Sequence, residues 1–401
     1  MSFHKKALYT DMTQNYLTPV EPMSHTRVKV RFRTGRGNVD RVTICYNGQK
    51  AIMRKDSFDD MFDYYAYHIR LTDEPIYYHF EVEAEDESCY YNRLGISKSE
   101  EARYDFILVP GFATPDWAKG AVVYQIYVDR FYNGDSSNDV VNDEYFYQGR
   151  PVKHAGHWND PVGRTDEGTF YGGDLQGIID KMDYLEGLGV EVLYLNPIFV
   201  SPSSHKYDIQ DYRHIDPHFG KIVNREECGL KDGYEQYRGI TTDRENLEAS
   251  DRLFARLVEE AHKRGMKVIL DGVFYCCGSW HRFMDKEGIY ANGDTCSIKG
   301  AYQDSNSPYR EYFQYKNPQD ANSYENWWGY EAYAKFNYEN SRKLYEYILS
   351  VAVKWVSKPF CADGWRVDVA ASVGNNREWN HHFWQDFRKA VKAANPEALI
   401  L

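Results

Sequence analysis

Long apolar runs are missing from this 401-residue sequence. No stretch approaches the roughly 20 apolar residues that a membrane-spanning helix needs. The first six residues also lead into no apolar core of the kind that a signal peptide has. We therefore expect no membrane partner, no cleaved leader and a cytoplasmic location.

Basic residues are too few to balance the acidic ones. Lys and Arg number 48 against 60 Asp and Glu, which gives a formal net charge of −12. An acidic chain repels the phosphate backbone of nucleic acids, so we expect no nucleic-acid partner. Neutral substrates and cation sites built from carboxylates remain compatible with this charge.

Cysteine is sparse, with seven residues and therefore an odd number. The spacing fits no metal-binding pattern, and the adjacent Cys276 and Cys277 cannot pair with each other in ordinary geometry. Free thiols in a reducing compartment are the simplest interpretation.

Aromatic residues, in contrast, are abundant: they make up 16% of the chain, with 35 Tyr and 9 Trp. Their flat apolar faces and polar edges suit stacking on sugar rings. An aromatic-rich core would give the same composition, so both interpretations stay open.

Residues 1–112 have the pattern of a β-sandwich. Val28, Val30 and Phe32 alternate with basic residues, and Asn47-Gly48 is a typical hairpin turn. Several short strands at this spacing favour two packed antiparallel sheets. Such a domain resembles a carbohydrate-binding module, or it serves packing alone.

Residues 113–401 alternate between strands and helices after a proline-flanked linker at 110–115. This alternation predicts parallel strands, in a (β/α)8 barrel or a doubly wound sheet. No Gly-rich phosphate fingerprint follows the first strand, which favours the barrel. A polar, aromatic-rich subdomain is expected as an insertion after the third strand, at about 276–338. Since only four strand–helix units are complete, we expect the chain to be the first half of the barrel and part of a longer protein.

The stretch 364–370 (GWRVDVA) places Arg366 and Asp368 on one face of the fourth strand. A guanidinium beside a carboxylate favours the ionised form that a nucleophile requires. Taken alone, the pattern is more often an ordinary ion pair.

Oxygen-bearing side chains crowd the seven residues that follow the first strand of the barrel. They are Asn133, Asp135, Asn138 and Asp139. Oxygen ligands at this density suit Ca²⁺. From the spacing alone, an Asn/Asp/Gly turn explains them better.

Seven ordered motifs resemble the α-amylase family, glycoside hydrolase family 13, in its neopullulanase, cyclomaltodextrinase and amylopullulanase branch. They are 123–131 (VYQIYVDRF), 170–175 (FYGGDL), 195–199 (LNPIF), 204–212 (SHKYDIQDY), 271–274 (DGVF), 334–337 (AKFN) and 364–370. The resemblance covers residue 118 to the end, and the branch also carries an N-terminal β-sandwich.

The resemblance implies that Asp368 is the nucleophile of a retaining glycoside hydrolase and that Arg366 holds it ionised. Retaining enzymes pair the nucleophile with an acid roughly 5 Å away. The family's acid would follow within two residues of the fifth strand, which begins at about Ala398. The 401-residue chain alone is therefore predicted to be inactive.

The resemblance also implies substrate-binding residues. Tyr207 would stack on the sugar at the cleaved bond, with His205 and Asp208 beside it, and Asp271 would be the family's structural aspartate at the third strand. Without the resemblance, Tyr207 reads as a core or surface tyrosine and Asp271 as an ion-pair partner of Arg366.

For calcium, the resemblance implies that Gly172 and Asp174 complete the ligand set, so that Ca²⁺ is the expected cofactor. Asp174 also fits the N-cap of the helix that it precedes.

One motif departs from the family. Tyr275-Cys276 replaces the Asn-His that the family has after the third strand, and cysteine is a poor substitute for a hydrogen-bonding histidine. We expect a hydrolase acting on α-1,4 and possible α-1,6 linkages of starch, pullulan or cyclodextrin. The alternative is a non-catalytic or weakly active α-glucan-binding relative. Members of the branch often dimerise through the N-terminal domain, so the resemblance also admits a homodimer.

Overall fold

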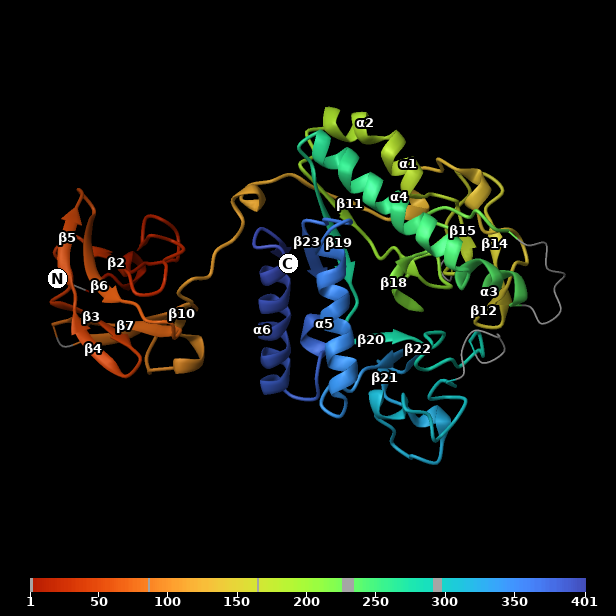
Figure 1. The fold of residues 1–401 in the computed structure, drawn as a ribbon. Coiled ribbons are helices and arrows are strands. Elements are labelled where there is room, and N and C mark those ends of the chain that lie inside the picture. Colours follow the sequence, from red (N-terminus) through yellow and green to blue (C-terminus); the bar gives the residue numbers. More distant parts are fainter. Residues whose placement is uncertain (1–2, 86, 164–165, 226–233, 291–297) are drawn as a thin grey trace. The chain divides into compact units, whose positions relative to one another are not determined.

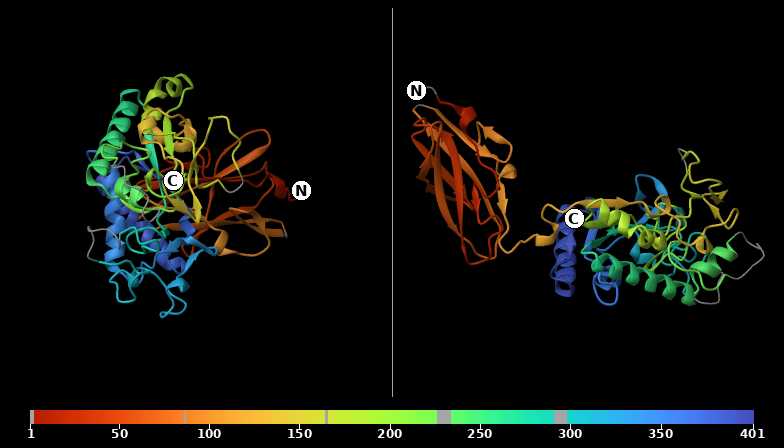
Figure 2. Two further views of the ribbon diagram at one scale, coloured as in Figure 1. Left: turned by 90° about the vertical axis from the view of Figure 1, so that its right-hand side faces the viewer. Right: turned by 90° about the horizontal axis from the view of Figure 1, so that it is seen from above.

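The structure is a computed structural model that describes residues 3–85, 87–163, 166–225, 234–290 and 298–401. The chain forms two compact units, Met1–Thr114 and Pro115–Leu401. Strands dominate the first unit, whereas helices and strands alternate in the second (Figure 2).

The first unit consists of two antiparallel sheets. One sheet has the strand order β1 (Leu17–Thr18), β2 (Arg27–Gly35), β6 (Phe62–Arg70) and β5 (Arg54–Phe58). The other has the order β4 (Gln49–Ile52), β3 (Arg41–Tyr46), β7 (Ile76–Ala84), β8 (Glu87–Asn92) and β9 (Gly95–Ser97), with β10 (Phe106–Leu108) also paired to β7.

Sequence alternation explains how these two sheets pack. Val28, Val30 and Phe32 of β2 are buried in one shared core with Ile44 and Phe80 of the other sheet. Asn47 and Gly48 both have positive φ, 43° and 76°, as the tight turn between β3 and β4 requires. The predicted β-sandwich is confirmed.

The second unit is organised around a five-stranded parallel sheet (Figure 1). The strands follow one another in chain order: β11 (Val123–Ile126), β16 (Val192–Leu195), β19 (Lys267–Gly272), β23 (Gly364–Val367) and β24 (Leu399–Ile400). Each crossover moves one strand along in the same direction, which is the topology of a barrel rather than of a doubly wound sheet. The predicted barrel half is confirmed.

Helices connect these strands. They are α1 (Leu175–Asp180), α2 (Met182–Gly187), α3 (Glu235–Thr241), α4 (Arg244–Lys263), α5 (Arg342–Val356) and α6 (Arg377–Ala394). Side-chain oxygens of Asp174, Asp243, Ser341 and Asn376 cap α1, α4, α5 and α6. Helix α4 lies along α1, and α5 lies along α6 (Figure 1). No helix in the described ranges combines the length and the apolar character that a membrane span requires.

Two elements differ from the expectation. The apolar stripe of Leu175, Ile178, Ile179, Met182 and Leu185 predicts one helix that ends before Gly189, but the structure divides it at Lys181 into α1 and α2. The apolar run 190–199 predicts one strand, but β16 ends at Leu195, because Pro197 has no amide hydrogen for a ladder. Phe199–Val200 instead forms β17 and pairs with β18 (Asp211–Ile215).

The insertion after β19 contains a small antiparallel sheet. Its order is β20 (Cys276–Gly278), β22 (Tyr330–Lys335) and β21 (Asn326–Trp327). Two further small pairs lie between β11 and α1, namely β12 (Phe146–Tyr147) with β13 (Arg150–Pro151) and β14 (Lys153–His154) with β15 (Thr169–Phe170).

Candidate active site

An arginine and two carboxylates meet at the carboxyl ends of β19 and β23. Asp271 and Arg366 are direct partners in the parallel register. One guanidinium nitrogen of Arg366 donates to Asp271 at 3.0 and 3.2 Å and to Asp368 at 2.6 Å. The structure therefore brings together both of the residues predicted to be catalytic and one of those predicted to bind substrate.

The two carboxylates differ in access to solvent. The side chain of Asp271 is fully buried, whereas that of Asp368 is 16% exposed. The backbone N–H of Asp368 donates to the carbonyl of Gly272 at 2.9 Å, which fixes the residue just beyond the end of β23. The next residue, Val369, has φ 44°, an unfavourable conformation for a β-branched side chain. Backbone strain of this kind occurs where a site holds a side chain in place.

Asp271 is held by three neighbours. The hydroxyls of Tyr194 and Tyr207 donate to one of its oxygens at 2.5 and 3.0 Å, in addition to the Arg366 contact. Burial raises the pKa of Asp271, although the Tyr194 hydrogen bond and the Arg366 charge oppose this. Asp271 is thus a buried anchor for the groups around it.

Tyr194 is a residue that the sequence analysis missed. It is the one polar-tipped side chain in the otherwise aliphatic strand β16, next to Leu193 and Leu195. A hydroxyl in a fully buried strand needs a hydrogen-bond partner, and that signal was available in the sequence.

Tyr207 and His205 lie beside this group of charges. Their rings are 5.9 Å apart, and His205 Nδ1 accepts from the backbone N–H of Tyr207 at 3.0 Å. Burial and the charge of Asp271 raise the pKa of the Tyr207 phenol, which therefore stays neutral and donates. Both side chains remain partly exposed.

Asp208 points into the protein instead. It is 1% exposed, and it accepts hydrogen bonds from the hydroxyls of Ser201 at 2.8 Å, Ser203, and Tyr147 at 2.9 Å. Both carboxylate oxygens of Asp208 accept hydrogen bonds from protein hydroxyls. This geometry suits holding the 201–208 loop in place rather than binding a ligand.

Tyr275 and Cys276 occupy a filled position. Tyr275 is 3% exposed and Cys276 is fully buried. Burial raises the pKa of the Cys276 thiol, so it stays protonated. His281 is equally buried, between the rings of Tyr212 and Phe283, and burial lowers its pKa to about 3. His281 therefore does not replace the missing histidine.

We expect that Cys276→His alone lowers the free energy of unfolding by roughly 1–3 kcal/mol, because a larger ring enters a full site. Adding Tyr275→Asn removes a buried aromatic ring as well, so the double variant should be no more stable than Cys276→His alone. Chemical denaturation of the three proteins measures this. A double variant more stable than the single one would contradict the packing argument.

The segment predicted to bind calcium is compact. Asn133 donates to both oxygens of Asp139 at 2.9 and 3.1 Å, and Asn138 donates to Asp174 at 3.2 Å. Asp174 also caps α1 by accepting from the backbone N–H of Gly177 at 2.6 Å. The structure thus supports the interpretation of Asp174 as a helix N-cap. The backbone N–H of Asp135 also donates to Asp174, at 2.8 Å. These hydrogen bonds bring the five side chains of the predicted calcium site close together.

Two features of that segment are those of a cation cradle. The side-chain oxygen of the buried Asn138 has no hydrogen-bond partner. Gly172 has φ 79°, and a Cβ there would lie 2.5 Å from Asn133 and from Asp139. One contact competes with a bound cation, because Lys221 already pairs with Asp135 at 2.5 Å. In the described part of the chain, no three His, Cys, Asp or Glu side chains cluster as a metal site, so amide and backbone oxygens would have to contribute.

Aromatic rings line two hollows beside the insertion. Trp327 borders both, one of about 570 Å³ with Tyr275 and one of about 550 Å³ with Trp280. Trp327 stacks on Trp328, which is 84% exposed, and on Tyr330. Exposed stacked rings are unusual on a protein surface and suit the faces of sugars.

The barrel half, with arginine-held carboxylates at the carboxyl ends of its strands, places the second unit in the (β/α)8-barrel class of proteins, which carry their functional residues at that end. Residues 125–228 and 249–401 match the α-amylase catalytic domain, and residues 1–109 match the α-amylase N-terminal Ig-like domain. The chain belongs to the α-amylase family.

Individual proteins of known name are similar to this chain over most of its length. Neopullulanase 2 of Thermoactinomyces vulgaris is 33% identical over 403 residues, covering 95% of this chain and 57% of the relative. The cyclomaltodextrinase of Thermoanaerobacter pseudethanolicus is 32% identical over 410 residues, covering 95% and 58%. The solved type III pullulan hydrolase of Thermococcus kodakarensis is 27% identical with a TM-score of 0.61, covering 98% of this chain and 60% of that one. The chain thus spans less than two thirds of the length of these relatives.

Proposed function

We propose that this chain carries the nucleophile side of a retaining α-glucan hydrolase that cleaves α-1,4 and α-1,6 glucosidic bonds. The observation that carries the proposal is Asp368. Its carboxylate is partly exposed, is paired with Arg366, and stands at the carboxyl end of a barrel strand.

In this mechanism a carboxylate oxygen of Asp368 attacks the anomeric carbon, and the glycosidic C–O bond breaks. A general acid gives its proton to the leaving oxygen, and water then hydrolyses the glycosyl ester. Asp271 is engaged by Arg366, Tyr194 and Tyr207, so we do not assign the acid to it. An acid shortly after β24 stays a prediction, as does the inactivity of the 401-residue chain alone.

For the substrate, Tyr207 supplies the ring on which a sugar stacks, and His205 a neighbouring hydrogen-bonding group. Asp208 and Asp271 act from inside, by holding the loop and the guanidinium. The neopullulanase and pullulan hydrolase names of the relatives point to α-glucans of this kind for the present protein.

A weakly active or purely glucan-binding protein is the second candidate, favoured by the buried Tyr275-Cys276 pair. The full protein should be incubated with pullulan, cyclodextrin and maltohexaose, and products should be measured together with binding. Release of short oligosaccharides supports the hydrolase, whereas binding without release supports the second candidate. Homodimer formation, a cytoplasmic location and glucan binding by residues 1–112 also stay predictions.

We also propose Ca²⁺ as a structural cofactor. Asn133, Asp135, Asn138, Asp139, Gly172 and Asp174 would hold it, the glycine through its backbone oxygen. Burial raises the pKa of Asp139 and of Asp174, a cost that a bound cation would offset. The ion would stabilise the segment between β11 and α1.

Calcium is expected to raise the melting temperature of the second unit. Free calcium at 100 times its dissociation constant adds about 2.7 kcal/mol of stability, and a chelator removes it. Asp139→Asn should abolish the shift, while Asp116→Asn, at a side chain that is 97% exposed, should retain it. A melting temperature that does not respond to calcium in the unaltered protein would contradict this proposal.

A further inference from the structure

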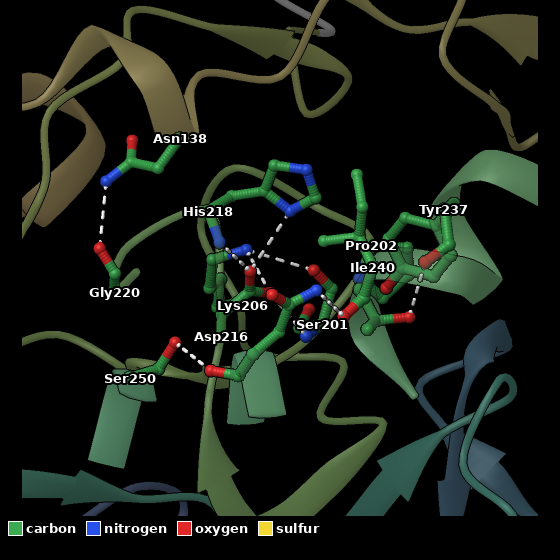
Figure 3. A network of polar contacts seen from close by, with 12 residues as sticks. Asn138, Ser201, Pro202, Lys206, Asp216, His218, Gly220, Tyr237, Ile240 and Ser250 are labelled. Atoms are coloured by element: carbon green, nitrogen blue, oxygen red, sulfur yellow. Dashed lines mark hydrogen bonds and ion pairs between the residues drawn. The ribbon is translucent and has the colours of Figure 1, made fainter. Parts of the chain in front are cut away.

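A chain of buried charges begins at Lys206, the residue before Tyr207, and Figure 3 shows its members Lys206, Asp216 and His218. Lys206 Nζ donates to Asp216 at 2.8 Å, and Asp216 lies 3.3 Å from His218 Nδ1. The other ring nitrogen of His218 lies 2.9 Å from Glu144. The four side chains are between 0% and 3% exposed.

The charges in this chain balance. Burial opposes the charge of His218, but Glu144 and Asp216 outweigh it and raise its pKa to about 9. Burial likewise opposes ionisation of Asp216, yet Lys206 and His218 hold its pKa well below the usual range. Two buried cations and two buried anions therefore alternate, and the partly exposed Arg225 lies a further 3.8 Å from Glu144. Removing Lys206 leaves the buried Asp216 without its lysine partner.

Lys206 also fixes its own loop. Its ammonium donates to the backbone oxygens of Ser201 at 3.0 Å and Ser203 at 3.4 Å, and its backbone N–H donates to the Ser203 hydroxyl at 3.0 Å. Lys206 has φ 60°, a left-handed conformation that is unfavourable for a residue with a Cβ. Such a backbone persists only where its surroundings determine it. The contacts of the Lys206 ammonium hold the backbone in this conformation, one residue before Tyr207.

The far end of the chain is anchored separately. Glu144 accepts from the backbone N–H of Val141 at 3.1 Å, in the segment that follows β11. The backbone N–H groups of Ser201 and His218 both donate to Asp216, at 3.0 and 2.8 Å. Three segments distant in sequence, which contain Glu144, Lys206 and Asp216, are thus joined by one network of buried charges.

We propose that Lys206 is a positioning residue: through its ion pair with Asp216 and the His218–Glu144 pair behind it, it sets the place of Tyr207 at the sugar-binding face. The importance of that place for substrate rests on the proposed function. The positioning itself does not, because the ring's environment can be observed without any glucan.

The test uses the full protein with 3-fluorotyrosine introduced at position 207 alone. In Lys206→Met, the single ¹⁹F resonance is expected to shift and to broaden or split, because the ring loses its fixed contact with Asp271. Lys267→Met is the matched control, since it removes a lysine that pairs with Asp363 at 3.0 Å at the opposite end of the barrel strands. It should leave the resonance unchanged.

A second readout is maltohexaose binding by calorimetry in an Asp368→Asn background, which prevents turnover. We expect Lys206→Met to weaken binding at least tenfold, and Lys267→Met to leave it as it was. An unchanged resonance in a folded Lys206→Met protein overturns the proposal, and so does an equal change in Lys267→Met. If Lys206→Met does not fold, Asp216→Asn takes its place with the same two criteria. If the resonance changes in Lys206→Met but the protein with native Lys206 does not bind maltohexaose, the positioning role stands and the proposed function is refuted.

Discussion

Asp368→Asn is expected to abolish glucan hydrolysis by the full protein, with kcat falling by about 10⁴-fold or more, as for the loss of other covalent nucleophiles. The amide has nearly the same shape but does not attack an anomeric carbon. The Arg366 contact, at 2.6 Å in the native protein, is retained as a weaker hydrogen bond from the charged guanidinium to the neutral amide oxygen, so the fold should survive. Product release from maltohexaose measures the effect.

The matched control is Asp183→Asn, at a side chain on α2 that is 86% exposed. Its kcat should equal that of the unaltered protein. A complementary experiment treats the native protein with a fluorinated glucosyl donor and locates the trapped sugar by peptide mass spectrometry. Attachment at any residue other than Asp368, or turnover by Asp368→Asn close to native, refutes the assignment.

Local patterns in the sequence predict much of this fold. The period-two alternation in β2 and the Asn47-Gly48 turn depend on neighbouring residues alone, and the structure has both. The apolar faces of α4, α5 and α6 are equally local. The break at Lys181 was missed because the apolar stripe runs through it without interruption.

The candidate site is less evident from the sequence, because its contacts join distant segments. The motifs indicate Asp271, Arg366 and Asp368 individually. They do not show that Tyr194, from β16, donates to Asp271. In the same way, the SHKYDIQDY stretch suggests that Asp208 meets substrate, whereas three hydroxyls from two segments turn it inward.

Lys206 shows the same limit most clearly. A lysine between His205 and Tyr207 reads as a surface residue, since lysines are almost never fully buried unless they are paired. Its partner, Asp216, directly follows β18, and the residue pattern of that segment does not indicate a strand. Pairing across strands is set by tertiary packing, so the sequence alone gave no signal for it.

Arg366→Met is expected to lower both stability and activity, since one guanidinium serves two carboxylates. Removing it leaves Asp271 buried beside Asp368 without a counter-charge. Solvent screens a guanidinium that is 31% exposed, so we expect a loss of roughly 1–3 kcal/mol in the free energy of unfolding, below the usual cost of breaking a buried pair. Arg264→Met, which breaks surface ion pairs with Asp183 and Glu260, is the control and should change stability little.

The pH dependence gives the sharper test. Burial raises the pKa of Asp271 above its unfolded value, so the folded protein binds that proton more tightly. Stability from this group is therefore lost as the pH rises through the window between the unfolded and the folded pKa. The charge of Arg366 opposes the rise in the pKa of Asp271, so Arg366→Met should extend this pH window to higher pH.

The double variant Arg366→Met/Asp271→Asn has no carboxyl group to titrate at position 271. It should therefore recover stability and lose the dependence of stability on pH in this window. It should not recover turnover, because Asp368 still lacks its guanidinium. If the Arg366→Met protein unfolds with the native pH slope, the guanidinium does not hold Asp271 in the way that the geometry requires.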